Sequence, residues 1–155
     1  MAKKVTNQKA SDNNYYHPDF HTALNYGIDY LHKNFGEESV REYLRQFVNS
    51  YYPVLKKDLT EKGLSAIKKH YEKIYQIENA VFNMHFSDDE LIIHLSESPA
   101  VMHIRAGGHP VSPLYYETVS TVNKEICNNT IYDCEMVEYN NENGSYQIRF
   151  FIKPK

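Results

Sequence analysis

Phe82-Asn-Met-His-Phe-Ser-Asp-Asp-Glu-Leu-Ile-Ile-His-Leu95 is the stretch in which the hydrophobic period of the chain changes from helical spacing to alternation. Apolar residues alternate on both sides of the polar run 87–90, which is typical of two strands joined by a hairpin loop. If the polar run forms the loop, each core-facing residue of the first strand lies opposite a core-facing residue of the second strand. The register predicted in this way pairs Phe86 with Leu91, Met84 with Ile93, and Asn83 with His94.

Helical periodicity covers the chain before this hairpin. Apolar residues recur at three- and four-residue steps in three stretches, which we expect to be helices: residues 20–35, 37–55 and 64–75. Gly36 suits a C-terminal cap of the first, and Pro53 should kink or split the second. The first fifteen residues are polar and without periodicity, and we expect a flexible tail there, with a single domain over residues 16–155. Pro18 is expected to be the first helical residue, which leaves His17 outside the helix.

Two Ser-Pro pairs follow the hairpin, and both predict helix starts. The pairs are Ser98-Pro99 and Ser112-Pro113, in which serine suits the N-cap and proline the first helical position. A Gly-Gly-His-Pro turn at 107–110 separates them. The second helix should end at Asn128-Asn129, and a last hairpin joins residues 131–139 to residues 145–152.

This order of elements predicts the fold class. We expect an α+β domain in which an N-terminal helical layer packs on an antiparallel sheet made of two hairpins, with two further helices between the hairpins. The composition includes 14 tyrosines and 7 phenylalanines but no tryptophan. Tyrosine has an apolar body with a polar tip, so this composition suits a partly wet pocket or an interface.

Charge and motifs exclude several classes of function. The 17 basic and 20 acidic side chains give a formal charge of −3. The sequence contains no long basic stripe, so we do not expect a nucleic-acid partner. No apolar run approaches the roughly 18 residues that a membrane span needs, and the N-terminus lacks the apolar segment of a signal peptide, so we expect a cytoplasmic protein without a membrane partner. Nucleotide-binding, serine-hydrolase and zincin motifs are absent. Cys127 and Cys134 lack zinc-site spacing, which favours a buried thiol pair, and we expect no metal and no cofactor.

The segment from Ser98 to Glu117 is the strongest candidate for a ligand site. Helix N-termini offer free N–H groups and a positive dipole end, and His103, Arg105 and His109 lie between the two predicted entrances. A small carboxylate or phosphate could be held there. The alternative is that the two Ser-Pro pairs serve only as helix caps.

Other histidines leave alternatives open. His21 and His32 lie at the edge of the first apolar stripe, where they line a pocket against the sheet or face water. His94 lies on the outer face of the hairpin, where it is exposed unless the Ser-Pro helices cover that face. In the second case it could approach His103 and Glu117 as a carboxylate-oriented histidine site for general base catalysis.

The sequence resembles a known family in its last third. Ser98-Pro99-Ala-Val-Met-His103, then Gly108-His109-Pro110-Val-Ser112-Pro113, the helix to Cys127 and the strand 143–150 resemble the L-2-amino-thiazoline-4-carboxylic acid hydrolase family. The same order of elements is similar to small-molecule-binding domains related to 4-vinyl reductases. Ser98 and Tyr116 stand where cysteine is common in the hydrolase family, so a reaction that needs those thiols is excluded here.

The resemblance implies a hydrolase that opens a 2-amino-thiazoline-type cyclic amidine. From the residues we infer a histidine, His103 or His109, or else Glu117, as the base, and Arg105 as the group that holds the ligand carboxylate. The further residues expected around the ligand are Ser98, Ser112, Tyr115 and Tyr116. Two alternatives remain: a non-catalytic binding or regulatory module of the same fold, and a subunit whose tyrosine-rich surface serves assembly into a homo-oligomer.

Overall fold

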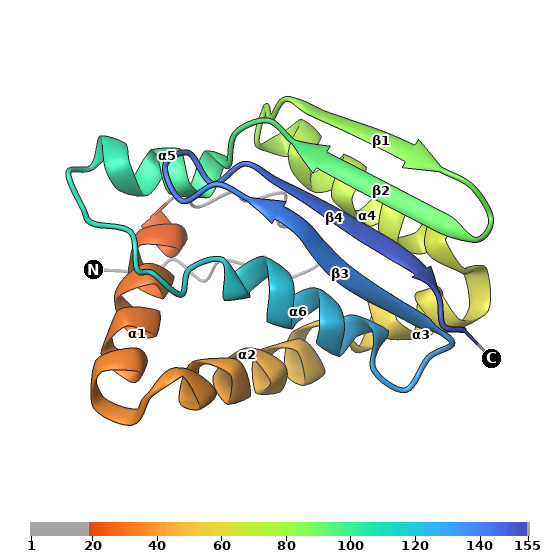
Figure 1. Cartoon of the computed structure of the whole chain (residues 1–155), viewed down its shortest axis with the longest axis horizontal. Coiled ribbons are helices and arrows are strands. Elements are labelled where there is room, and N and C mark those ends of the chain that lie inside the picture. Colours follow the sequence, from red (N-terminus) through yellow and green to blue (C-terminus); the bar gives the residue numbers. More distant parts are fainter. Residues whose placement is uncertain (1–18, 155) are drawn as a thin grey trace, which may run out of the picture.

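The computed structural model describes residues 19–154, and it has the predicted α+β fold. In Figure 1, α1 and α2 lie along the left and lower sides of the molecule, α6 lies between them and β3, and α4 runs behind β2 and β4. The flexible tail and the helix start expected at Pro18 lie outside the described residues. Between residues 19 and 154, none of the helices combines the length and the apolar content that crossing a membrane requires.

Four helices form the first half of the described chain. They are α1 (Asp19–Phe35), α2 (Glu37–Tyr51), α3 (Pro53–Lys62) and α4 (Leu64–Ile77). Gly36 separates the first two at φ +86°, a left-handed conformation that favours glycine. Pro53 splits the long predicted helix into α2 and α3, because proline fits the first helical position but not a helix interior.

The strands pair into one antiparallel sheet in the order β1-β2-β4-β3. They are β1 (Phe82–Phe86), β2 (Glu90–Leu95), β3 (Tyr132–Tyr139) and β4 (Tyr146–Ile152). The predicted register of the first hairpin is confirmed, with Phe86 opposite Leu91, Met84 opposite Ile93 and Asn83 opposite His94. The two hairpins join through β2 and β4, where Ile93 lies opposite Ile148.

One face of the sheet forms the core with the helices. Alternate residues of the two central strands are buried there: Leu91, Ile93 and Leu95 of β2, and Tyr146, Ile148 and Phe150 of β4. Helix α4 packs against β1 and β2, and α6 packs against β3. His85 and His94 are exposed on the other face. The alternative in which the Ser-Pro helices cover His94 is wrong, because α5 (Pro99–Ala106) packs against α1 and α6 (Glu117–Cys127) against α2.

The two Ser-Pro pairs behave differently. Ser98 is the N-cap of α5, and its Oγ accepts a hydrogen bond from the N–H of Val101 at 3.3 Å. Ser112 does not cap α6, so the helix start predicted there is wrong. Hydrogen bonds between residues three apart form a tight turn that leads into α6 at Glu117, while the Asn25 side chain of α1 bonds the N–H of Ser112 at 2.7 Å.

Candidate functional site

A cavity of about 650 Å³ lies between the helical layer and the core face of the sheet. Side chains of α1, α2, α4 and α6 line it, together with the first turn of α5 and the ends of β2, β3 and β4. Its walls are largely apolar and aromatic, and eight of the lining side chains are tyrosines: Tyr43, Tyr51, Tyr52, Tyr71, Tyr75, Tyr115, Tyr139 and Tyr146. Small-molecule sites have volumes of roughly 300–1,000 Å³ with apolar walls and a few polar groups, and this cavity has both properties.

Helix α4 forms the long wall of the cavity. His70, Tyr71, Ile74, Tyr75 and Glu78 all line it, and their spacing places them on one side of the helix. At 1.5 Å per residue, His70 and Glu78 are about 12 Å apart along the helix axis. The cavity therefore has two chemically different ends along α4.

Tyrosine hydroxyls lie at the centre of this wall. Tyr75 and Tyr146 hydrogen-bond each other, and Tyr71 donates to the Oδ1 atom of Asn123 at 2.7 Å. Burial is the main cause that raises the pKa of Tyr71, Tyr75 and Tyr146. These phenols are uncharged at neutral pH, so they offer a ligand aromatic faces and neutral hydrogen-bonding groups.

His70 marks one end of the cavity. Its ring makes edge contacts with Tyr52 and Tyr71, at centroid distances of 5.4 and 5.3 Å. Burial, and to a lesser extent the nearby charge of Lys73, lowers the pKa of His70 to about 4. Burial also raises the pKa of Tyr52 to about 12. This end therefore presents a neutral imidazole and a neutral phenol at pH 7.

His21 and Glu78 mark the other end. His21 Nε2 lies 3.6 Å from Glu78 Oε1, and the two side chains are 19% and 13% exposed. The other ring nitrogen of His21 lies 3.5 Å from the hydroxyl of Tyr115. Of the two alternatives left open for His21, the structure shows the pocket. Sequence reasoning did not single out Glu78, although an acidic residue just after a helix opposes the helix dipole and so is a detectable signal.

The residues predicted to bind or turn over a ligand are distributed over several places. Ser98 and Tyr115 line the large cavity. Tyr116 and Glu117 line a second, more polar cleft of about 580 Å³ between α2, α6 and β3. Ser112 is buried beside α1, where its N–H bonds Asn25.

His103, Arg105 and His109 each contact a different part of the chain. His103 Nε2 lies 3.5 Å from Asp19 Oδ1 at the surface, and Arg105 donates to the main-chain oxygen of Asn141 at 3.0 Å. The Nδ1 atom of His109 lies 2.9 Å from the hydroxyl of Tyr26. The three side chains share no partner, and Arg105 holds the β3–β4 loop against α5.

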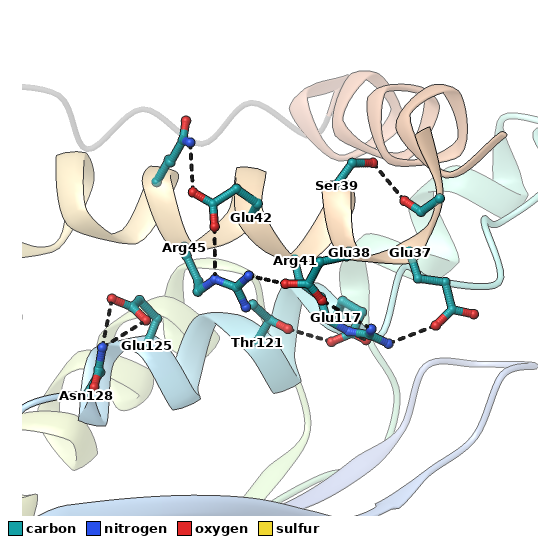
Figure 2. A network of polar contacts seen from close by, with 12 residues as sticks. Glu37, Glu38, Ser39, Arg41, Glu42, Arg45, Glu117, Thr121, Glu125 and Asn128 are labelled. Atoms are coloured by element: carbon teal, nitrogen blue, oxygen red, sulfur yellow. Dashed lines mark hydrogen bonds and ion pairs between the residues drawn. The ribbon is translucent and has the colours of Figure 1, made fainter. Parts of the chain in front are cut away.

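Although Glu117 borders the second cleft, its carboxylate is engaged in a network of ion pairs and hydrogen bonds (Figure 2). Its carboxylate accepts hydrogen bonds from Arg41 Nε at 2.9 Å and from Thr121 Oγ1 at 2.6 Å, and its side chain is only 5% exposed. The bond to Glu117 is the main cause that raises the pKa of Arg41. Both carboxylate oxygens are engaged, so Glu117 joins α6 to α2.

The two cysteines form the buried thiol pair that the sequence favoured. Cys127 on α6 and Cys134 on β3 are both free and buried. The hydrogen bond between Cys134 and Cys127, together with burial, raises the pKa of Cys134. A neutral buried thiol is a poor nucleophile, so Cys134 packs in the core.

Within residues 19–154, no cluster of three or more histidine, cysteine, aspartate or glutamate side chains has a geometry that could hold a metal ion. No protein-family model matches the chain, and no curated protein matches it either.

Proposed function

We propose that the protein binds a small apolar or aromatic molecule in the cavity along α4. The observation that carries this proposal is the cavity itself, about 650 Å³ in volume and lined by aromatic side chains with few polar groups. The lining residues come from elements far apart in the sequence, so the cavity depends on the whole fold. A cavity of this kind is the usual form of a small-molecule site.

The contacts favour binding over catalysis. General base catalysis needs a base within hydrogen-bonding reach of the reacting water and of the ligand. Glu117 is engaged by Arg41 and Thr121, while His103 and His109 contact the outer part of α1. Ring opening of a cyclic amidine stays a prediction, and incubation with 2-amino-thiazoline-4-carboxylate followed by a free-thiol assay tests it.

A neutral fluorescent probe tests the binding proposal. N-Phenyl-1-naphthylamine brightens in apolar surroundings, and we expect its fluorescence to rise saturably on titration with the protein. Val119 lines the cavity from α6, so Val119→Trp should fill part of the space and weaken probe binding by about tenfold or more.

Val54→Trp is the matched control, because Val54 is 73% exposed on α3 and does not line the cavity. This variant should bind the probe as the wild type does. Circular dichroism and melting curves check that both variants fold. A wild-type protein that shows no saturable binding, or a folded Val119→Trp variant that binds unchanged, would overturn the proposal.

A further inference from the structure

We infer that the cavity takes an organic cation, an amine-bearing apolar or aromatic molecule whose ammonium group lies against Glu78 and whose body lies along the tyrosine wall of α4. This inference rests on the proposed function and adds the chemical class of the ligand. It differs from the carboxylated ligand that the sequence predicted, and that ligand was expected at Arg105, which does not line this cavity.

The position of Glu78 is the first argument. Glu78 is the C-cap residue of α4, at the end where the helix dipole is negative. A carboxylate placed there and only 13% exposed is unfavourable unless a positive group lies close to it. His21 supplies such a group only when it is protonated, and its Nε2 atom stays 3.6 Å from the carboxylate. A ligand ammonium can take this role at the same carboxylate.

The tyrosine wall is the second argument. Tyr75 and Tyr71 lie about one and two turns before Glu78, and Tyr115 faces the same end from across the cavity. Aromatic faces attract cations, most strongly where water is excluded. Burial is the main cause that raises the pKa of Tyr75 and Tyr146, and the Glu78 carboxylate is a lesser cause for both, so its negative charge acts on this wall.

The positive features around the cavity do not favour an anion. Lys73 is exposed at the rim, where water screens its charge, and His70 is neutral because burial lowers its pKa to about 4. The first turn of α5 also borders the cavity. Pro99, however, has no N–H, and the N–H of Val101 already donates a hydrogen bond to the Ser98 side chain. Few backbone N–H groups at the start of α5 therefore remain to bind a ligand.

Three ligands with one shape and different charge test the inference. We expect isothermal titration calorimetry at pH 7.5 to show that 4-phenylbutylamine binds about tenfold more tightly than 4-phenylbutan-1-ol, with 4-phenylbutyrate weakest. Glu78→Gln should reduce the affinity for the amine to that for the alcohol. The affinity for the alcohol should stay within about twofold of its wild-type value. Glu72→Gln is the matched control, because Glu72 lies on α4, pairs with Lys68 and does not line the cavity.

The outcomes separate this inference from the proposed function. The inference is overturned if the amine binds no more tightly than the alcohol, or if the preference for the amine survives Glu78→Gln. In either case, binding of the neutral probe still supports the cavity as a ligand site. Absence of binding for the neutral probe and all three phenylbutyl compounds overturns both. The affinity of Glu78→Gln for the neutral probe shows whether that variant keeps its fold.

Discussion

At the scale of single residues, burial decides which polar side chains are chemically available. Glu117 stood in the sequence as a candidate base, but its partner Arg41 lies 76 positions earlier in the chain. Local spacing gives no sign of such a pair, because it forms only when α2 packs on α6. The pairing of Glu78 with His21 also needs a distant helix, although the place of Glu78 just after α4 is a local signal.

His70 gives a prediction about pH at this scale. Its pKa is about 4 in the folded protein, below the ordinary value of 6.5, so the unfolded chain binds the proton more readily. The neutral ring is compatible with the fold above pH 6.5, and stability should be lost as the pH falls from there toward 4. Between pH 7 and pH 4.5, the wild type should lose about 2 kcal/mol more of its free energy of unfolding than His70→Phe does.

Urea unfolding of both proteins at the two pH values measures this difference. The other titrating groups are the same in both proteins, so their contribution cancels in the comparison. Equal losses for wild type and variant would show that His70 is readily protonated in the folded state.

At the scale of elements, the strength of the local pattern determined how well each element could be predicted. Both hairpins were predicted, and the first was predicted in its correct register. Alternating apolar residues and a polar loop are local signals, because they involve residues close together in the sequence. The Ser98 cap was correct for the same reason. The Ser112 cap was wrong because the residues after it form a turn of hydrogen bonds between residues three apart, and α6 begins only at Glu117.

Two glycines give a matched prediction for the elements. Gly144 has φ +68°, and a Cβ atom there would lie 2.5 Å from Val101 Cγ2 and 2.6 Å from Ser98 Cβ. Gly144→Ala should therefore destabilise the fold by about 3 kcal/mol, through left-handed backbone strain and overpacking of the β3–β4 loop against α5.

Gly27 lies inside α1, and a Cβ atom there would meet no atom within 4 Å. Gly27→Ala should stabilise the protein by about 0.5–1 kcal/mol, because alanine favours a helix interior over glycine. Melting temperatures or urea midpoints of the two variants check the pair. If Gly144→Ala and Gly27→Ala lost similar amounts of stability, the packing described for the β3–β4 loop would be contradicted.

At the scale of the whole molecule, the cavity is the feature that sequence reasoning could foresee only in outline. Fourteen tyrosines suggested a partly wet pocket or an interface, and eight of them line the cavity. Which tyrosines gather there depends on how α4, α6 and the sheet pack together, and that arrangement is set by contacts between distant segments. The predicted α+β layout is confirmed, whereas the expected ligand site at Arg105 remains a prediction.

The most direct measurement of the central claim is methyl NMR of the protein labelled at isoleucine, leucine and valine, recorded during titration with N-phenyl-1-naphthylamine. We expect the largest shift changes at cavity methyls such as Ile74, Val119 and Val122, and none at the exposed methyls of Val54, Ile131 and Val137. Shift changes confined to the exposed methyls, or no change at saturating probe, would contradict the account of this cavity as the ligand site.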